Sequence, residues 1–296
     1  PTLIQILIFL IKYISRKIIL KIKSLFLYKQ WFILYTENKN FSIYKYKKII
    51  PPKGYYYADP FPVEKDNKKY VFFEERKVSN NKGFISLLEI DKDNVNIIHN
   101  ILKKDYHLSY PNVFFHNNNI YLLPETTKNR TVELYISNGD LTKWNFKRIL
   151  LKNVIASDPT IFYYNSKWWL FFSGSDDLNN RYQPDARLYL YYSDSLETEF
   201  LPHKNNPIKI DIRSSRPAGK IFINNNKIIR PAQNCAKTYG ASIVFNQIIE
   251  ISENDYKEVE FSYIQPEWDN NLLGCHTFNF SNNIICIDAA KNRFRI

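Results

Sequence analysis

The chain changes its pattern of hydrophobic and polar positions once, near residue 30. Residues 3–28 read LIQILIFLIKYISRKIILKIKSLFLY, in which basic residues recur among Ile and Leu at roughly helical spacing. The apolar run at its start is too short for a transmembrane helix of about 20 residues. From Gln30 onward, short apolar or alternating runs between polar turns predict β-strands. We therefore expect an amphipathic basic helix or linker over residues 1–29 and an all-β domain over residues 30–296.

A short hairpin pattern recurs about every 50 residues in the β part of the chain. Each copy has a strand, a polar turn such as KDNK or HNNN, and a second strand. The spacing leaves room for two more strands per copy, for example GFISLLEI at 83–90 and RLYLYYS at 187–193. The copies read DPFPVEKDNKKYVFFEER from Asp59, YPNVFFHNNNIYLLPET from Tyr110, DPTIFYYNSKWWLFFSGS from Asp158, RPAGKIFINNNKIIRPAQ from Arg216 and CHTFNFSNNIICIDA from Cys275.

Five copies of a four-stranded unit predict a five-bladed β-propeller. A β-sandwich is the alternative all-β fold, but it does not account for the regular repeat. We expect the ring to close because the strand at 30–35 joins the last blade. The run FSIYKY at 41–46 predicts a further short strand.

Equivalent positions of successive blades converge on the central funnel of a propeller, so the repeat predicts which polar residues share a ring. The residue before the proline of each of the first four copies and the residue fourteen after that proline supply most of these polar residues. The catalytic candidates are Asp59, Asp158, Glu125 and Glu74. The candidates for substrate binding are Tyr110, Arg216, Arg230, Gln233 and His276. In the fourth copy the later position falls on Pro231.

These residue types suit glycosidic chemistry. One carboxyl group donates or accepts a proton, and another attacks the anomeric carbon or stabilises positive charge on it. Arginine binds phosphate or carboxylate through two parallel hydrogen bonds. The alternative for a residue before proline is purely structural, because such a residue favours an extended conformation and an Asp there can cap a turn. We interpret Glu75 as an outward neighbour of Glu74.

The net charge of +12 is concentrated at the N-terminus, where residues 1–30 hold six basic residues and no acid. This favours peripheral contact of residues 3–28 with an anionic membrane. A helix that packs on the propeller or follows an upstream fused domain explains the pattern equally well, and the start at Pro1 without any Met leads us to expect such an upstream part. The remaining lysines form no Arg-rich aromatic array, so we expect no nucleic-acid partner.

The three cysteines form no CxxC pair, so no zinc site is expected, and their odd number favours a reducing compartment. We expect a cytoplasmic location, with residues 3–28 able to hold the protein at the inner face of a membrane. No cofactor and no catalytic metal are expected, and a structural ion in the funnel is left open.

The segments ADPFPVEKDNKKYVFFEE, YPNVFFHNNNIYLLPET and SDPTIFYYNSKWWLFFSGS resemble the blade motifs of the propeller domain at the N-terminus of glucosamine inositolphosphorylceramide transferases. The resemblance runs from about Gln30 to the end, and it places the chain among five-bladed propellers of the glycoside hydrolase family 43 type. Those enzymes use an Asp at the start of the first blade as base or nucleophile, which Asp59 matches. They also use an Asp and a Glu from the next two blades. Here Tyr110 stands where the second blade would offer the Asp, and Asp158 follows in the third blade.

The resemblance implies a carbohydrate-active propeller in the synthesis of surface glycans or glycolipids, as a glycosyltransferase or its propeller module, with a glycan or sugar nucleotide as substrate. In the plant transferases the transferase fold is a separate C-terminal domain, so that activity does not carry over directly. Asp59 would be base or nucleophile, Asp158 would stabilise an oxocarbenium ion or serve as a hydrogen-bond partner, and Glu125, or else Glu74, would be the acid. Arg216 and Arg230 would hold an anionic group. A family 43-like glycoside hydrolase and a non-catalytic glycan-binding module stay open as alternatives.

Overall fold

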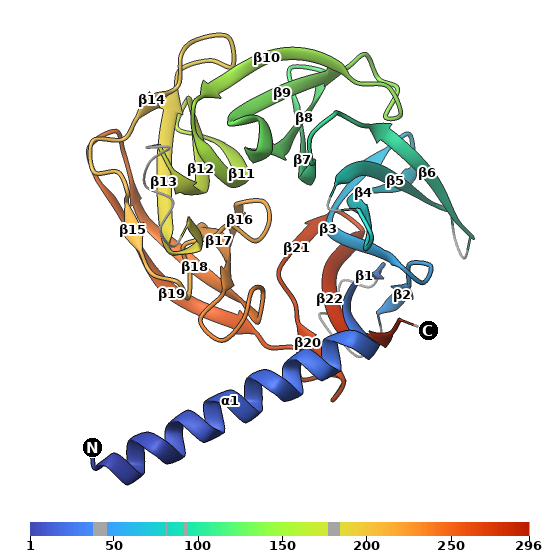
Figure 1. Ribbon diagram of the computed structural model, residues 1–296. Coiled ribbons are helices and arrows are strands. Elements are labelled where there is room, and N and C mark those ends of the chain that lie inside the picture. The colour runs from blue at the N-terminus through green and yellow to red at the C-terminus, as the bar shows by residue number, and fades with distance from the viewer. Residues whose placement is uncertain (38–45, 81, 92–93, 177–183, 296) are drawn as a thin grey trace.

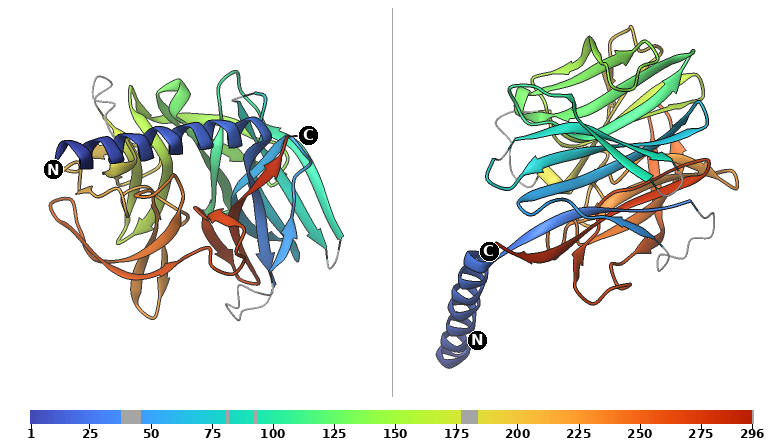
Figure 2. Two further views of the ribbon diagram at one scale, coloured as in Figure 1. Left: turned by 60° about the horizontal axis from the view of Figure 1, so that its bottom comes forward. Right: turned by 90° about the vertical axis from the view of Figure 1, so that its right-hand side faces the viewer.

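The computed structural model is a five-bladed β-propeller preceded by one helix, so the predicted fold class is confirmed (Figure 1). The helix α1 (Leu3–Phe26) extends away from the propeller (Figure 2). Among the described residues, no helix combines the length and the apolar character that a membrane crossing requires. Residues 41–45 of the predicted strand at 41–46 lie outside the described part. The structure describes residues 1–37, 46–80, 82–91, 94–176 and 184–295.

Each blade is an antiparallel sheet. The first blade contains β3 (Tyr55–Lys65), β4 (Lys68–Lys77), β5 (Gly83–Asp91) and β6 (Asn94–Leu102). The second contains β7 (Ser109–His116), β8 (Asn119–Thr126), β9 (Thr131–Ser137) and β10 (Asn145–Lys152). The third contains β11 (Ile155–Tyr164), β12 (Lys167–Ser175), β13 (Arg187–Ser193), β14 (Leu201–Pro202) and β15 (Lys209–Ile210).

The last two blades complete the ring. The fourth blade contains β16 (Phe222–Asn224), β17 (Lys227–Asn234), β18 (Ser242–Ile251) and β19 (Tyr256–Ile264). The fifth contains β1 (Leu27–Thr36), β2 (Lys47–Ile49), β20 (Leu272–Gly274), β21 (Phe278–Ser281) and β22 (Ile284–Phe294). Because β1 pairs with β22 along its whole length, the two ends of the propeller lie in one blade, as predicted.

The Asn-rich turns of the hairpins have a physical reason. In the first four blades both turn residues have positive φ, for example 51° and 60° at Asp66 and Asn67 and 47° and 61° at Asn225 and Asn226. A two-residue turn of this kind matches the twist of the strands that it joins, and Asn tolerates the left-handed conformation better than most residues. The turns therefore set the register of each hairpin.

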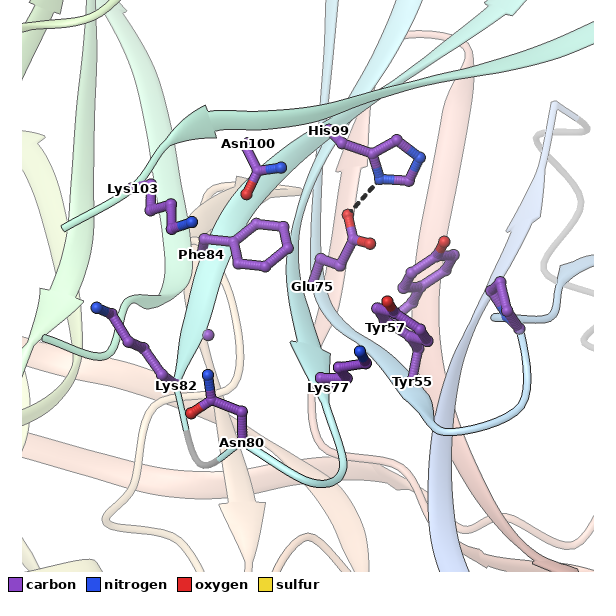
Figure 3. Close-up of a pocket in the computed structure, with 12 residues that line it drawn as sticks. Tyr55, Tyr57, Glu75, Lys77, Asn80, Lys82, Phe84, His99, Asn100 and Lys103 are labelled. Carbon is purple, nitrogen blue, oxygen red and sulfur yellow. Dashed lines mark hydrogen bonds and ion pairs between the residues drawn. The ribbon is translucent and has the colours of Figure 1, made fainter. Parts of the chain in front are cut away.

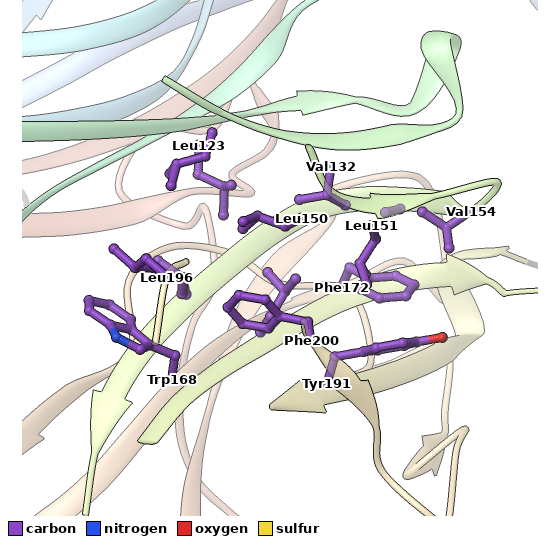
Figure 4. Close-up of a cluster of buried hydrophobic side chains, with 14 of the residues drawn as sticks. Leu123, Val132, Leu150, Leu151, Val154, Trp168, Phe172, Tyr191, Leu196 and Phe200 are labelled. Atoms are coloured by element: carbon purple, nitrogen blue, oxygen red, sulfur yellow. The ribbon is translucent and has the colours of Figure 1, made fainter. Parts of the chain in front are cut away.

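Apolar side chains between neighbouring blades form the core. In β12 the residues Trp168, Leu170 and Phe172 pack toward the second blade, and Figure 4 shows part of this cluster. The alternate residues Trp169 and Phe171 belong to a different cluster, which includes residues of the fourth blade. A strand that is buried on both faces reads as a continuous apolar run, and each fully buried side chain contributes about 1.5–3 kcal/mol. This packing holds the inner strands at fixed positions around the centre.

Candidate functional site

A cavity of about 340 Å³ lies where the inner strands of the blades meet. Six of the predicted site residues line it: Asp59, Glu74, Glu125, Asp158, Arg216 and His276. The lining also includes residues that the sequence did not single out: Lys29, Trp31, Arg76, His107 and Tyr239. We call this space the funnel cavity.

A second and larger pocket, of about 610 Å³, lies beside the first blade and is shown in Figure 3. Of the described residues that line it, Glu75 is the single carboxylate. Its Oε2 atom is engaged by Ser86 Oγ at 2.7 Å and by His99 Nδ1 at 2.6 Å. A carboxylate without a second one nearby does not suit acid–base chemistry on a glycosidic bond. The funnel cavity is therefore the better candidate for chemistry.

Strand β4 lies between the two pockets, and its side chains alternate between them. Successive residues of a strand point to opposite sides. Glu74 and Arg76 line the funnel cavity, whereas Glu75 and Lys77 line the outer pocket. The interpretation of Glu75 as the outward neighbour of Glu74 is confirmed.

The residues before three of the prolines have a left-handed backbone. Their φ angles are 52° at Asp59, 46° at Tyr110 and 52° at Asp158, and the strand register shifts at each of these places. The extended conformation expected of a residue before proline is therefore not adopted. Each such residue instead sits in a β-bulge, which re-aims its side chain. Non-glycine residues held there cost about 1–3 kcal/mol each, and such strain clusters at functional sites.

Each bulge directs a backbone N–H toward a carboxylate of the preceding blade. Tyr110 N donates to Asp59 Oδ2 at 3.1 Å, and Asp158 N donates to Glu125 Oε2 at 2.9 Å. In the first blade, Asp59 N donates to Asp288 Oδ2 at 3.0 Å. Contacts across the blade boundaries thus offset the local strain and fix the orientation of the carboxylates.

Asp59 is buried and lies among other charged groups. Burial raises the pKa of Asp59 to about 6, with Asp158 and Asp288 raising it further and His276 opposing them. Thr277 Oγ1 donates to Asp59 Oδ1 at 2.8 Å. At pH 7 this carboxyl group is mainly ionised, so it can accept a proton or attack an electrophile.

Glu74 differs from Asp59 in its protonation state near neutral pH. Burial raises the pKa of Glu74 to about 8, and the neighbouring Asp59 and Glu125 contribute to the rise. His107 Nε2 lies 3.7 Å from Glu74 Oε1, but burial lowers the pKa of His107 to about 4. The imidazole is therefore neutral at pH 7. Gly83 N donates to His107 Nδ1 at 2.7 Å, which places the imidazole proton on Nε2. Glu74 is thus protonated near neutral pH.

Asp158 forms an ion pair within the cavity. Its Oδ2 atom lies 2.7 Å from Arg216 Nε and accepts a hydrogen bond from Gln233 Nε2 at 2.6 Å. Burial raises the pKa of Asp158 to about 7, although Arg216 opposes this. Arg216 also pairs with Asp185 at 2.6 Å and lies 3.8 Å from Glu125. The guanidinium of Arg216 is therefore occupied by carboxylates of the protein itself.

Three of the predicted binding residues do not line the funnel cavity, and the first of these is Tyr110. Its side chain is fully buried, and its hydroxyl accepts from Gly219 N at 2.7 Å and lies 2.8 Å from Thr160 Oγ1. The prediction that the Tyr110 side chain faces the funnel cavity is therefore wrong. The phenol instead joins the second blade to Thr160 of the third blade and to Gly219, which precedes β16 of the fourth.

Arg230 and Gln233 are the other predicted binding residues that do not line the cavity. The Arg230 side chain is engaged elsewhere. Its Nε and Nη2 atoms bind both carboxylate oxygens of Glu258, at 2.8 and 2.7 Å. The reason is the register of the fourth hairpin. Its turn lies two residues farther from the proline, so Gln233, and not Pro231, matches Glu74 in the first blade. Arg230 precedes Gln233 by three residues and faces the opposite side of the strand. Gln233 itself is buried and positions Asp158.

His276 is held by an acid that the sequence analysis missed. Its Nδ1 atom lies 2.6 Å from Asp288 Oδ2, and its ring stacks on Trp31 with centroids 3.9 Å apart. Burial lowers the pKa of His276, but Asp288 and the other nearby carboxylates raise it more, so the net pKa is raised. A lone Asp within the apolar run IICIDAA was the available signal for Asp288. Trp31 and Lys29 come from a strand outside the repeat, so no register could place them.

Donor atoms of Asp59, His276 and Asp288 lie within 4.8 Å of one another, a spacing that a cation could bridge. In the structure the imidazole is instead hydrogen-bonded to Asp288, and Asp59 accepts from Thr277. The protein thus satisfies these atoms internally, and an ion in the funnel stays a prediction.

Comparison with known proteins identifies the family. Residues 46–276 match the family described as glucosamine inositolphosphorylceramide transferase 1, N-terminal. The chain belongs to this family. The transferase of that name from Oryza sativa subsp. japonica is 32% identical over 206 residues, which cover 68% of this chain and 27% of the relative. The transferase from Arabidopsis thaliana is 31% identical over 210 residues, which cover 70% of this chain and 27% of that relative. The chain thus spans about a quarter of the length of these members of the family.

Several solved structures have the same fold as this chain. A β-xylosidase superposes with a TM-score of 0.57 and 13% identity, covering 82% of this chain and 93% of its own. A family 117 glycoside hydrolase from Zobellia galactanivorans superposes with a TM-score of 0.53 and 12% identity, and the superposition covers 89% of this chain and 91% of the hydrolase chain. At such identities the likeness shows the propeller fold alone.

Proposed function

We propose that the funnel cavity processes a glycosidic linkage in the synthesis of a surface glycan or glycolipid, with glycosyl transfer as the favoured reaction. The observation that carries this proposal is the pair Asp59 and Glu74. The two carboxyl groups line one cavity and have pKa values of about 6 and about 8. A pair of acids with separated pKa values provides a base and an acid at the same pH. The relatives are named as transferases of a glycolipid, which supports a glycolipid acceptor.

The groups of the cavity would divide the work as follows. Ionised Asp59 takes the proton from the attacking hydroxyl or attacks the anomeric carbon, and protonated Glu74 gives its proton to the departing oxygen. Asp158, held by Arg216, stabilises positive charge on the sugar ring. Glu74 suits the role of acid better than Glu125, which accepts from Asp158 N and lies beside Arg216.

The test uses nucleotide sugars in one arm and aryl glycosides in the other. We expect transfer from a nucleotide sugar, and we expect its loss in Asp59→Asn and Glu74→Gln without a loss of folding. The matched control is Asp66→Asn, at the exposed turn of the same hairpin. Hydrolysis of aryl glycosides alone would favour the glycosidase, which the shared fold with a β-xylosidase supports. Glycan binding without turnover of either substrate would contradict both enzymatic functions.

We also propose that α1 contacts an anionic membrane surface from the cytoplasmic side. Apolar side chains such as Leu7 and Phe9 are exposed on α1 together with Lys12 and Lys17. A helix with this composition lies in the interface of a bilayer. It ends at Phe26, shortly before Lys29 of the funnel cavity, so a helix bound to lipid would hold the cavity near the membrane.

Sedimentation with vesicles tests the membrane contact. We expect binding to vesicles that contain anionic lipid, weaker binding after Lys12→Glu with Lys17→Glu, and weaker binding at high salt. Equal binding of this variant and of the unchanged protein would contradict the proposal.

A further inference from the structure

The cations of the funnel cavity are not equivalent. Arg216 is surrounded by Asp158, Asp185 and Glu125. Lys29 and Arg76, in contrast, form no ion pair with any residue that the structure describes. The positive charge available to a ligand therefore lies on Lys29 and Arg76, and not on the arginines that the sequence suggested.

Arg76 has an unused donor. Its Nε atom is buried and has no hydrogen-bond partner within the described ranges. The guanidinium lies over the ring of Tyr56, 4.8 Å from its centroid, and Tyr56 is the cross-strand partner of Arg76 in β3. A buried guanidinium N–H without a partner is costly, and a ligand that accepts a hydrogen bond would remove that cost. The stacking on Tyr56 fixes the plane in which this ligand would bind.

Lys29 stands in a similar setting on the neighbouring blade. Its Nζ atom lies 4.4 Å from the centroid of the Trp31 ring and donates to the carbonyl oxygen of Tyr239 at 3.1 Å. An ammonium group has three N–H donors, so donors remain for a ligand. Burial lowers the pKa of Lys29, as expected of a cation that is partly removed from water.

A small apolar cluster connects the two cations. Trp31 and Ala58 are buried in it, and Tyr56 packs against them. Lys29 lies over Trp31 and Arg76 over Tyr56, so the cations flank one aromatic wall of the cavity, where the fifth and first blades meet. The carboxyl groups elsewhere in the cavity would repel an anion, which leaves this wall as its place.

We propose that Lys29 and Arg76 bind a phosphate group of the substrate against the wall formed by Trp31 and Tyr56. A tetrahedral oxyanion can offer separate oxygens to an ammonium and to a guanidinium. The assignment rests on the proposed function in placing the substrate in this cavity. It adds the chemical class of the group that is recognised and the residues that recognise it. The phosphate could belong to a nucleotide donor or to a lipid acceptor, since both present the same oxygens.

Calorimetric titration of the whole chain tests this subsite with two soluble probes. Uridine diphosphate represents a nucleotide donor, and glycerol 3-phosphate represents a lipid headgroup. We expect the protein to bind at least one of them, and we expect Lys29→Gln and Arg76→Gln each to weaken that binding about tenfold or more. The probe that binds more tightly identifies the source of the phosphate. Arg76→Lys should keep part of the affinity, because it keeps the charge without the fork of donors.

Lys77→Gln is the matched control. Lys77 follows Arg76 on β4 but lines the outer pocket with Lys82 and Lys103. Its loss should leave the binding of both probes unchanged, and thermal unfolding of each variant verifies that it is folded. The proposal is overturned if neither probe binds, if Lys29→Gln and Arg76→Gln bind as well as the unchanged protein, or if Lys77→Gln is the variant that loses binding.

The proposed function can fail separately from the subsite. If both cavity variants lose the phosphate probe but no sugar is turned over, the subsite stands and the enzymatic function fails. If sugars are turned over and Asp59→Asn abolishes this, while the cavity variants keep full affinity for both probes, the subsite fails alone.

Discussion

The protonated state of Glu74 has a consequence for stability that requires no knowledge of the substrate. Burial raises the pKa of Glu74 from 4.5 to about 8. The folded protein therefore holds this proton more tightly than the unfolded chain. The resulting stability is fully present below pH 4.5 and is lost as the pH rises through about 8. The variant Glu74→Gln keeps the shape and a hydrogen-bond donor of the protonated acid but cannot ionise.

The size of the effect follows from the two pKa values. The interval from 4.5 to about 8 corresponds to about 5 kcal/mol of unfolding free energy. Glu74→Gln should therefore differ little from the unchanged protein in its pH dependence below pH 4.5. It should become progressively more stable by comparison as the pH rises, up to that amount above pH 8. For a chain of this size the gain corresponds to about 10 °C or more in Tm.

Thermal unfolding between pH 4 and pH 9 measures this difference. Glu89→Gln, which removes a surface carboxylate that pairs with Lys68 at 2.7 Å, is the control and should keep the slope of the unchanged protein. Parallel Tm curves for Glu74→Gln and the unchanged protein would refute the reasoning. Glu74 would then be ionised in the folded state at neutral pH, and it could not act as the acid.

Three further outcomes follow from the same structure. Turnover should have a bell-shaped pH dependence, with an acid limb between about pH 6 and pH 7, where Asp59 and Asp158 must ionise, and a basic limb near pH 8, where Glu74 loses its proton; a profile that stays flat across this range would contradict the assignment. Gly219→Ala should lower the Tm strongly, because φ is +140° and a Cβ would overlap a carbonyl oxygen of β21; thermal unfolding measures the loss, and an unchanged Tm would refute the prediction. Arg230→Met should cost about 1.5–3 kcal/mol by removing the bidentate partner of Glu258, which keeps Lys209 at 2.7 Å, yet the variant should bind the phosphate probes normally; a folded variant that loses this binding would return Arg230 to the site.

Much of the architecture could be predicted because it depends on local periodicity. The recurring hairpins with their Asn-rich turns are each defined within about twenty residues, and their number determines the number of blades. Alternation along a strand was enough to assign Glu74 to the funnel and Glu75 to the outside. The ring then followed, because equivalent positions of repeated units face a common centre.

The tertiary structure alone decided what the convergent residues do there. The left-handed backbone at Asp59 and Asp158 opposes the local preference before proline, and carboxylates from other blades stabilise it across long distances in the sequence. Contacts between blades also decide which cations are already paired with carboxylates of the protein. Arg216 is paired in this way, so Lys29 and Arg76 are the better candidates for binding an anion. A repeat determines which positions meet, whereas pairing, burial and proton affinity depend on the neighbours that only the closed ring supplies.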